Sequence, residues 1–268
     1  MTNYNFPVES NNGYIIHFPR NNDGDYSLNN NLADPFAESA TQLFPLGTIL
    51  IDGDRKWVYC KNGSVALNIA APVQSAAAVH AEQDDDIVVG AAAAIAATAV
   101  ELTSTANLDG APNNVANDFK EGYMVVNDEA GEGQLRKIIS NDALVTTGDS
   151  TFNLYDALTI ALTTSSEAGI VRSPYYKVIA TAAVVTGKVI GVPLIAVTAS
   201  YYFWCQCAGP APVVMHAACA LGTLVVVGTT AAKADPMAAV TTEVIIGEMM
   251  TPGVADTETA IVFLRLGF

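Results

Sequence analysis

Three thiols and one imidazole lie close together near the C-terminal end of the chain, at Cys205, Cys207, His216 and Cys219. Sulfur and imidazole nitrogen are preferred ligands of Zn²⁺, so this set is chemically sufficient for a zinc site. However, Cys205 and Cys207 lack the spacing of a zinc knuckle, and free cysteine is among the most buried residue types. We therefore expect these cysteines to pack as small apolar side chains, and we predict neither a metal nor a cofactor.

Other candidates for catalysis are weaker. None of the histidines, His17, His80 and His216, stands in a Gly-X-Ser-X-Gly or Cys-His context. The loop Gly131-Glu132-Gly133 resembles a phosphate-binding turn, but acidic residues flank it and no Gly-Lys-Ser/Thr follows. Its glycines are better explained as the positive-φ residues of a hairpin loop. The run Asp84-Asp85-Asp86 lacks the spacing of an EF-hand, and such runs are usually solvated. The sequence thus predicts a protein that is not an enzyme.

The composition argues against two classes of partner. With 27 acidic and 12 basic residues, the 268-residue chain has a net charge of -15 and no run of lysine or arginine, so we expect no direct contact with nucleic acid. The apolar stretch 178–204 is interrupted by Lys188, Gly191 and Pro193, so we expect no membrane span. The first residues do not read as a secretory signal, which indicates synthesis and folding in the cytoplasm.

The sequence pattern predicts that short β-strands between turns position the candidate cysteines and histidines. Residues 47–69 alternate apolar and polar side chains around Asp52-Gly53 and Asn62-Gly63, two strong hairpin signals. No alternation with long amphipathic helices occurs, which disfavours a parallel sheet with helical crossovers. The alanine-rich region 71–118 fits either a short helix or strands of small residues. The sequence predicts an all-β fold of antiparallel barrel or sandwich modules.

Large rings are expected on both faces of the strands. On the strand after Asp52-Gly53, side chains alternate between faces, so Trp57 and Tyr59 share one face while Val58 and Cys60 share the other. The stretch 199–214 contains four consecutive aromatic residues, whose rings should alternate between the two faces of a strand. The rings on one face can fill the barrel of their own module, while those on the other face meet a second module or a neighbouring subunit. The segment Gly209-Pro210-Ala211-Pro212 should end this strand, because proline cannot donate to the ladder.

Changes in composition divide the chain into three segments. Residues 1–45 are rich in asparagine and carry isolated aromatic residues, so we expect an extended N-terminal arm that orders against a neighbour. Residues 46–180 are expected to form a β-rich domain, and residues 181–268 a C-terminal β-barrel-like module. The aromatic residues predicted to lie in interfaces are Tyr4, Phe6, Tyr14, Phe18, Trp57, Tyr201, Tyr202 and Trp204.

Several motifs, in this order, resemble those of tailed-bacteriophage capsid decoration (cement) proteins. They are "EGYMVVNDEAGEGQLRKIISN", "LYDALTIAL", "SPYYKV" and "GVPLIAVTASYYFWCQCAGPAPVV", followed by a final module that ends in "IVFLRL". The resemblance covers roughly residues 46–268 and leaves the arm unmatched. Two departures are that Ser200 stands where glycine is expected, and that Cys205 and Cys207 occupy positions expected to vary.

The resemblance implies a virion structural protein without catalytic activity. It would be a homo-oligomer, expected to be a trimer, that decorates the exterior of the capsid and bridges subunits of the major capsid protein. An alternative is a head-fibre or tail-associated protein that binds the host, in which exposed rings such as Tyr175 and Tyr176 would stack on sugars. An acidic β-barrel hydrolase is the weakest alternative, because no catalytic set stands out.

Overall fold

The computed structural model of the chain describes residues 8–9, 15–17, 33–81, 83, 87–108, 115–238, 243–251 and 256–267. Every element with described bounds is a β-strand, and all pairings between these strands are antiparallel, which confirms the predicted fold class. Within these residues, no helix is long and apolar enough to span a bilayer.

The strands, in chain order, are β1 (Val8–Glu9), β2 (Ile15–His17), β3 (Glu38–Ser39), β4 (Ile49–Asp52), β5 (Arg55–Lys61), β6 (Val73–Gln74), β7 (Ile87–Val89), β8 (Ala99–Ser104), β9 (Tyr123–Asp128), β10 (Leu135–Asn141), β11 (Gly148–Leu154), β12 (Glu167–Val171), β13 (Ile179–Ala180), β14 (Val189–Pro193), β15 (Tyr202–Val214), β16 (Leu224–Val227), β17 (Ala234–Pro236), β18 (Ile245–Met249) and β19 (Thr259–Arg265).

The chain forms two compact units, and the second is inserted into the first. The first unit consists of Met1–Ala76 and Pro174–Phe268, and the second of Ala77–Ser173. This division differs from the predicted boundary between residues 180 and 181. The reason is that β5 pairs with β15, while β6 pairs with β13 and β14, so residues far apart in sequence build one sheet.

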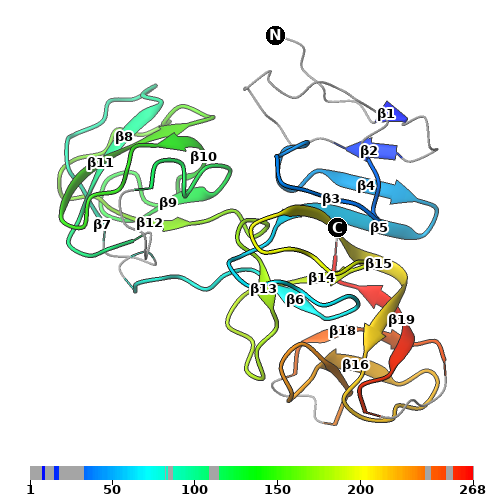
Figure 1. Ribbon diagram of the computed structural model, residues 1–268. Helices are drawn as coiled ribbons and strands as arrows, with labels where there is room; N and C mark the ends of the chain where they lie inside the picture. Colours follow the sequence, from blue (N-terminus) through cyan, green and yellow to red (C-terminus); the bar gives the residue numbers. More distant parts are fainter. Residues whose placement is uncertain are drawn as a thin grey trace. The chain divides into compact units, whose positions relative to one another are not determined.

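The long strand β15 is central to the first unit (Figure 1). It lies between β5 and β19 in a sheet whose main path runs β1-β2-β4-β5-β15-β19-β18-β16-β17. On one face of β5 and β15, Trp57, Tyr59 and Trp204 join one buried cluster. On the other face, Val58, Cys60, Phe203 and Cys205 join a second buried cluster. The predicted distribution of these side chains between two faces is therefore confirmed.

The expected end of β15 at Gly209-Pro210 is wrong, since the strand continues to Val214 and Pro210 pairs with Phe263 of β19. Leu266 donates to the Cys207 carbonyl, so odd-numbered residues direct their backbone groups toward β19. Both prolines are even-numbered, and their missing N–H groups therefore lie on the side away from β19. On that side, the pairing of β15 with β5 ends at Ala208, and the buried Gln206 amide donates to the carbonyls of Ala208 (3.0 Å) and Pro210 (2.8 Å).

One of the two predicted hairpins is present. β4 and β5 are joined by a tight turn, with Asp52 paired to Arg55 and Gly53 at φ +60°, as the Asp-Gly signal predicts. The hairpin predicted at Asn62-Gly63 is wrong. The buried Asn62 amide instead donates to the carbonyls of Val65 and Thr198, each at 3.0 Å, which ties the end of β5 to a remote turn.

Part of the predicted N-terminal arm belongs to the first unit itself. β2 pairs with β4, and Ile16 is buried in the same cluster as Trp57 and Phe44. The segment therefore contributes to the core of its own chain, because its apolar residues reach the edge of the sheet. Tyr4, Phe6, Tyr14 and Phe18 lie outside the described residues, as does the run Asp84-Asp85-Asp86.

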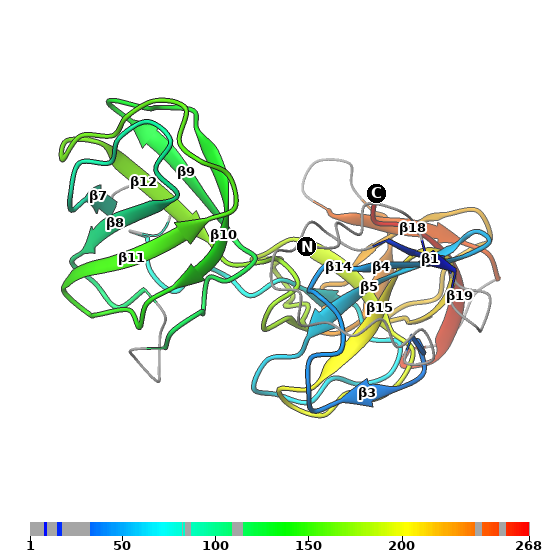
Figure 2. The same cartoon turned by 90° about the horizontal axis from the view of Figure 1, so that it is seen from above.

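The second unit is a closed barrel with the strand order β10-β11-β8-β7-β12-β9 (Figure 2). Its interior is filled by apolar side chains, among them Ile87, Phe119, Met124 and Phe152. β9 and β10 form the hairpin predicted around Gly131-Glu132-Gly133, and both glycines have positive φ. Where the structure describes the alanine-rich region, it contains the strands β6, β7 and β8, with exposed turns between them.

A short motif with similar sequence and similar backbone hydrogen bonds occurs in both units. In the first unit, Leu67 exchanges two backbone hydrogen bonds of 2.9 Å with Val197, and Ala70 donates to Pro193. In the barrel, Ala93 and Leu162 exchange two such bonds, and Ala96 donates to Leu158. The segments concerned are 67–71 (LNIAA) with 193–200 (PLIAVTAS), and 93–97 (AAIAA) with 158–165 (LTIALTTS). We call these two arrangements the paired-turn motif.

Both copies of the paired-turn motif contain an alanine in the left-handed region, Ala70 at φ +61° and Ala96 at φ +69°. An isoleucine, Ile69 or Ile95, precedes the alanine in each copy, and the segment bridged to it contains a second isoleucine, Ile195 or Ile160. The two units therefore share a local structure as well as a sequence pattern.

Candidate functional site

The cysteines and His216 are not brought together as a ligand set. Cys60 and Cys205 lie in one buried cluster of the first unit, whereas Cys219 lies in another. The His216 Nδ1 atom is 3.0 Å from an Asp235 carboxylate oxygen. Within the described part of the chain, no group of three or more His, Cys, Asp or Glu side chains is arranged to hold a metal ion.

The buried thiols are held in their protonated form. Desolvation by burial, together with a smaller effect of the neighbouring Cys60, raises the pKa of Cys207 to about 12. Burial and Cys60 likewise raise the pKa of Cys205 well above its ordinary value. Because the thiolate is the nucleophile and the metal ligand, these cysteines act as apolar packing residues in the folded chain.

The aromatic residues predicted to form interfaces divide into two groups. Trp57 and Trp204 are 0% and 2% exposed, so both indoles pack inside their own chain and are not available to a partner. Tyr201 and Tyr202 are half-buried and reach the surface. The ring of Tyr202 is stacked on that of Tyr59, with their centres 6.0 Å apart, and the Lys61 ammonium lies 5.2 Å from the Tyr202 ring centre.

Tyr175 and Tyr176 are also half-buried, and their ring faces have neighbours within the chain. The ammonium groups of Lys61 and Lys177 each lie 5.2 Å from the Tyr176 ring centre. The Tyr175 ring packs against Gly47, where an added Cβ would lie 2.9 Å from it. The expected pair of exposed stacking platforms is therefore not present.

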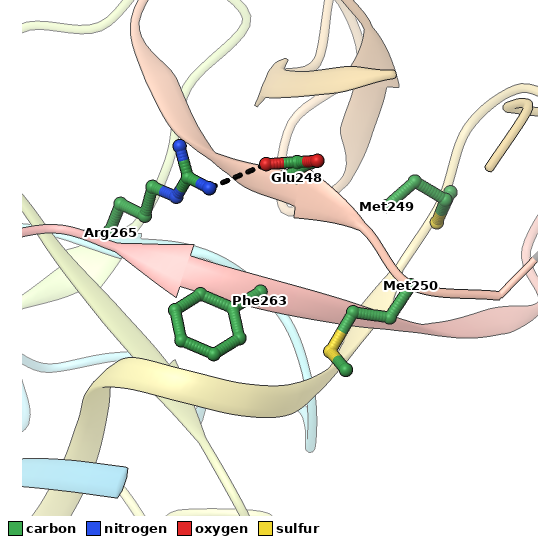
Figure 3. Close-up of a pocket in the computed structure, with 5 residues that line it drawn as sticks. All are labelled: Glu248, Met249, Met250, Phe263 and Arg265. Atoms are coloured by element: carbon green, nitrogen blue, oxygen red, sulfur yellow. Dashed lines mark hydrogen bonds and ion pairs between the residues drawn. The ribbon is translucent and has the colours of Figure 1, made fainter. Parts of the chain in front are cut away.

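A surface hollow of about 250 Å³ lies over β18 and β19 (Figure 3). It is lined by Glu248, Met249, Met250, Phe263 and Arg265. Arg265 reaches from β19 to Glu248 on β18, and their N and O atoms are 2.5 Å apart. This hollow combines apolar side chains with one ion pair at its edge, which suits the capture of a partner's apolar side chain with a polar neighbour.

The hollow belongs to a larger apolar surface on the outer face of the same sheet. Met250 and Ile261 are 44% and 45% exposed, and the Met250 N–H donates to the Ile261 carbonyl, so they lie side by side. Pro210 and Pro212 of β15 are the register partners of Phe263 and Ile261. We call the surface formed by Met250, Ile261, Phe263, Pro210 and Pro212 the C-terminal face.

The sequence of β19 contains a signal for the C-terminal face. In β19, the buried residues Ala260, Val262 and Leu264 alternate with Ile261, Phe263 and Arg265. An alternating strand whose second face is also largely apolar indicates a second contact surface. The alternation in β19 does not reveal whether its second face is exposed to solvent. Exposure depends on which other strands cover that face, and these strands are remote in sequence.

Comparison with family models, with curated proteins and with solved structures finds no match to this chain. The resemblance to capsid decoration proteins therefore stays a prediction from the motifs, and the surfaces described above are the basis for a proposal about function.

Proposed function

We propose that the protein is a non-enzymatic virion structural protein that decorates the outer surface of a phage capsid and bridges its major capsid subunits. The proposal includes a homo-oligomer, expected to be a trimer. It acts by adhesion through surfaces on a rigid β framework, without contact to nucleic acid or membrane.

The observation that carries the proposal is the C-terminal face. Solvent-exposed Met250 and Ile261 flank a hollow that also contains Phe263 and the Glu248–Arg265 ion pair. β18 and β19 are backed by a buried cluster that includes Ile246, Val262 and Leu264, so the face is held in place before any partner binds. A preordered apolar surface loses little conformational entropy on association, which favours tight attachment.

The structure gives the host-binding alternative little support at Tyr175 and Tyr176, the residues expected to stack on sugars. Sugar stacking needs an accessible ring face, whereas lysine ammonium groups lie over Tyr176 and the ring of Tyr175 packs against Gly47. An exterior position on the capsid also suits a net charge of -15, because the packaged genome would repel this chain.

Co-sedimentation with empty expanded shells of the cognate major capsid protein tests the proposal. Wild-type protein should sediment with the shells, and a variant with Met250→Gln and Ile261→Thr should bind at least about 10-fold more weakly, because it removes apolar contact area. Val184→Thr is the matched control, since Val184 is an exposed apolar residue of the same unit outside the C-terminal face. Binding to whole host cells, with none to shells, would instead support the host-binding alternative.

A further inference from the structure

The short strand β2 completes one edge of the sheet in the first unit (Figure 1). It pairs with β4 in a single register, which joins Ile15 to Ile51, Ile16 to Leu50 and His17 to Ile49. Ile16 and Leu50 are both 0% exposed, and both belong to the buried cluster that contains Trp57. Without β2, β4 would be an edge strand with unpaired backbone groups and an uncovered Leu50, so β4 is an acceptor site for a strand.

Within the described residues, β2 has few attachments apart from β4. On its other side it pairs with β1, which has only two residues. Ile15 is 42% exposed, so Ile16 is the described side chain of β2 that anchors the strand in the core. A three-residue strand with one buried anchor can occupy any identical acceptor site, because the contacts are the same in each copy.

The connection between β2 and the rest of the first unit is long. Residues 18–32 separate His17 from Ala33, which lies in the same buried cluster as Ile16. A chain of this length spans up to about 50 Å when extended. A compact unit of the size of the first unit is about 40 Å wide. The connection therefore does not confine β2 to its own β4, and the β4 of an adjacent copy is within its reach.

The pairing of β2 with β4 is free of acidic side chains, which matters in a chain with a net charge of -15. Neither the stretch 13–19 (GYIIHFP) nor the stretch 43–51 (LFPLGTILI) contains Asp or Glu. Asp52, at the end of β4, lies beyond the register with β2 and forms an ion pair with Arg55. Two acidic copies repel each other over much of their surfaces, whereas backbone hydrogen bonds and an apolar anchor can join them without opposing carboxylates.

We infer that β2 is exchanged between copies, so that β2 of one copy pairs with β4 of a neighbouring copy in the homo-oligomer. A single copy closes the same pairing on itself, and exchange keeps its register and its buried isoleucine. Exchange of an identical element needs no new kind of contact, which makes it a simple route to an oligomer. The inference rests on the proposed function only for the homo-oligomer, and it adds the surfaces through which the copies join.

Cysteines on the two strands distinguish exchange from pairing within one chain. Ile15 and Ile51 are register partners, and directly opposite residues of antiparallel strands are close enough for a disulfide. Full-length Ile15→Cys and full-length Ile51→Cys are refolded together, oxidised with glutathione disulfide, denatured and separated by electrophoresis without reductant. Exchange predicts a covalent dimer that contains one chain of each variant. Pairing within each chain places the two new cysteines in different molecules that do not meet, so it predicts no such dimer.

A matched control measures cross-linking by random collision. Val65→Cys takes the place of Ile15→Cys, because Val65 is a 73% exposed apolar residue of the same unit outside β2. Refolded together with Ile51→Cys, it should give no covalent dimer above the level of each variant alone. The four native cysteines are buried, so they do not compete for the oxidant in the folded chain.

A second variant tests the exchange without cross-linking. Ile16→Ala should raise the dissociation constant of the oligomer at least about 10-fold in sedimentation equilibrium, because it removes the buried anchor of β2. Ile15→Ala is the control, since it shortens the exposed neighbour and should leave the constant nearly unchanged. If β2 pairs within its own chain, Ile16→Ala should lower the stability of the first unit without changing the dissociation constant.

The outcomes separate the inference from the proposed function. If the wild type is an oligomer but the mixed cysteine variants give no covalent dimer, the inference is rejected, and binding to empty expanded shells would still support the decoration role. If the wild type sediments as a monomer, the inference is rejected as well. If the covalent dimer forms and the wild type does not bind the shells, the inference stands and the decoration role is rejected.

Discussion

Replacing Asp118 by asparagine should destabilise the barrel, because it breaks an ion pair that is buried on both sides. Asp118 is fully buried, Arg172 is nearly so, and the Arg172 Nε atom donates to Asp118 Oδ2 at 2.7 Å. The guanidinium also lies 5.1 Å from the centre of the Phe119 ring. Asparagine keeps the size of the side chain and removes its charge, so the Arg172 cation is left in the interior without its carboxylate.

The expected loss follows from the cost of an uncompensated buried charge. Removing one partner of a buried ion pair typically costs about 3–5 kcal/mol, and asparagine, which can still accept a hydrogen bond, should lie near about 3 kcal/mol. For a unit of roughly 100 residues, each kcal/mol lowers the melting temperature by about 4–8 °C. The barrel transition should therefore move down by at least about 12 °C. Replacing the pair together, with Asp118→Leu and Arg172→Met, should cost less than Asp118→Asn alone.

Two measurements distinguish the barrel from the first unit, namely tryptophan fluorescence during thermal unfolding and the hydrogen exchange rate of a barrel amide. The two tryptophans of the chain, Trp57 and Trp204, both lie in the first unit, so their fluorescence reports on that unit. Hydrogen exchange of the Ile138 amide, which donates to the Gly122 carbonyl, reports on the barrel. Asp142→Asn is the control, because it removes an exposed carboxylate from the same unit. Equal melting of the two variants would refute the assignment of this ion pair as a main support of the barrel.

Three further predictions concern the first unit. Ser200 has φ +65°, so Ser200→Gly should raise the free energy of unfolding by about 1 kcal/mol, and a lower urea midpoint by tryptophan fluorescence would contradict this. The four buried thiols should react with a thiol reagent only as fast as the chain opens, which stopped-flow comparison with the unfolding rate can check: Cys60, Cys205, Cys207 and Cys219. Burial raises the pKa of Asp235, but hydrogen bonds from Thr229 and His216 outweigh it and lower the pKa below 3.8. The stabilisation is therefore present above about pH 4 and lost as the pH falls further, so Asp235→Asn should lower the urea midpoint at pH 7 but not at pH 2.

Local sequence patterns predicted the fold class and the faces of individual strands. The alternation of side chains around Trp57 is sufficient to assign Trp57 and Tyr59 to one cluster and Val58 and Cys60 to the other. The turn after Asp52 was predictable because Gly53 supplies a positive φ within a tight hairpin. These features depend on residues that are neighbours in sequence.

The features that the sequence did not reveal depend on remote residues. The Asn62 side chain is directed inward by the carbonyl of Thr198, and no property of the Asn-Gly pair shows this. Pro210 is compatible with a long strand because it lies beyond the pairing with β5, which ends at Ala208, and the Gln206 amide donates to its carbonyl. The candidate surfaces share this origin, since the outward position of Ile261 depends on the pairing of β19 with β15.

The paired-turn motif places buried and exposed apolar side chains close together in one local structure. A non-glycine residue in the left-handed region costs about 1 kcal/mol, and Ala70 and Ala96 both carry this cost. In return, the turn directs the preceding side chain outward, and Ile69 and Ile95 are both exposed while Leu67 and Ala93 are buried. Because both copies carry this strain, it belongs to the turn itself, which combines one buried and one exposed apolar side chain in a few residues.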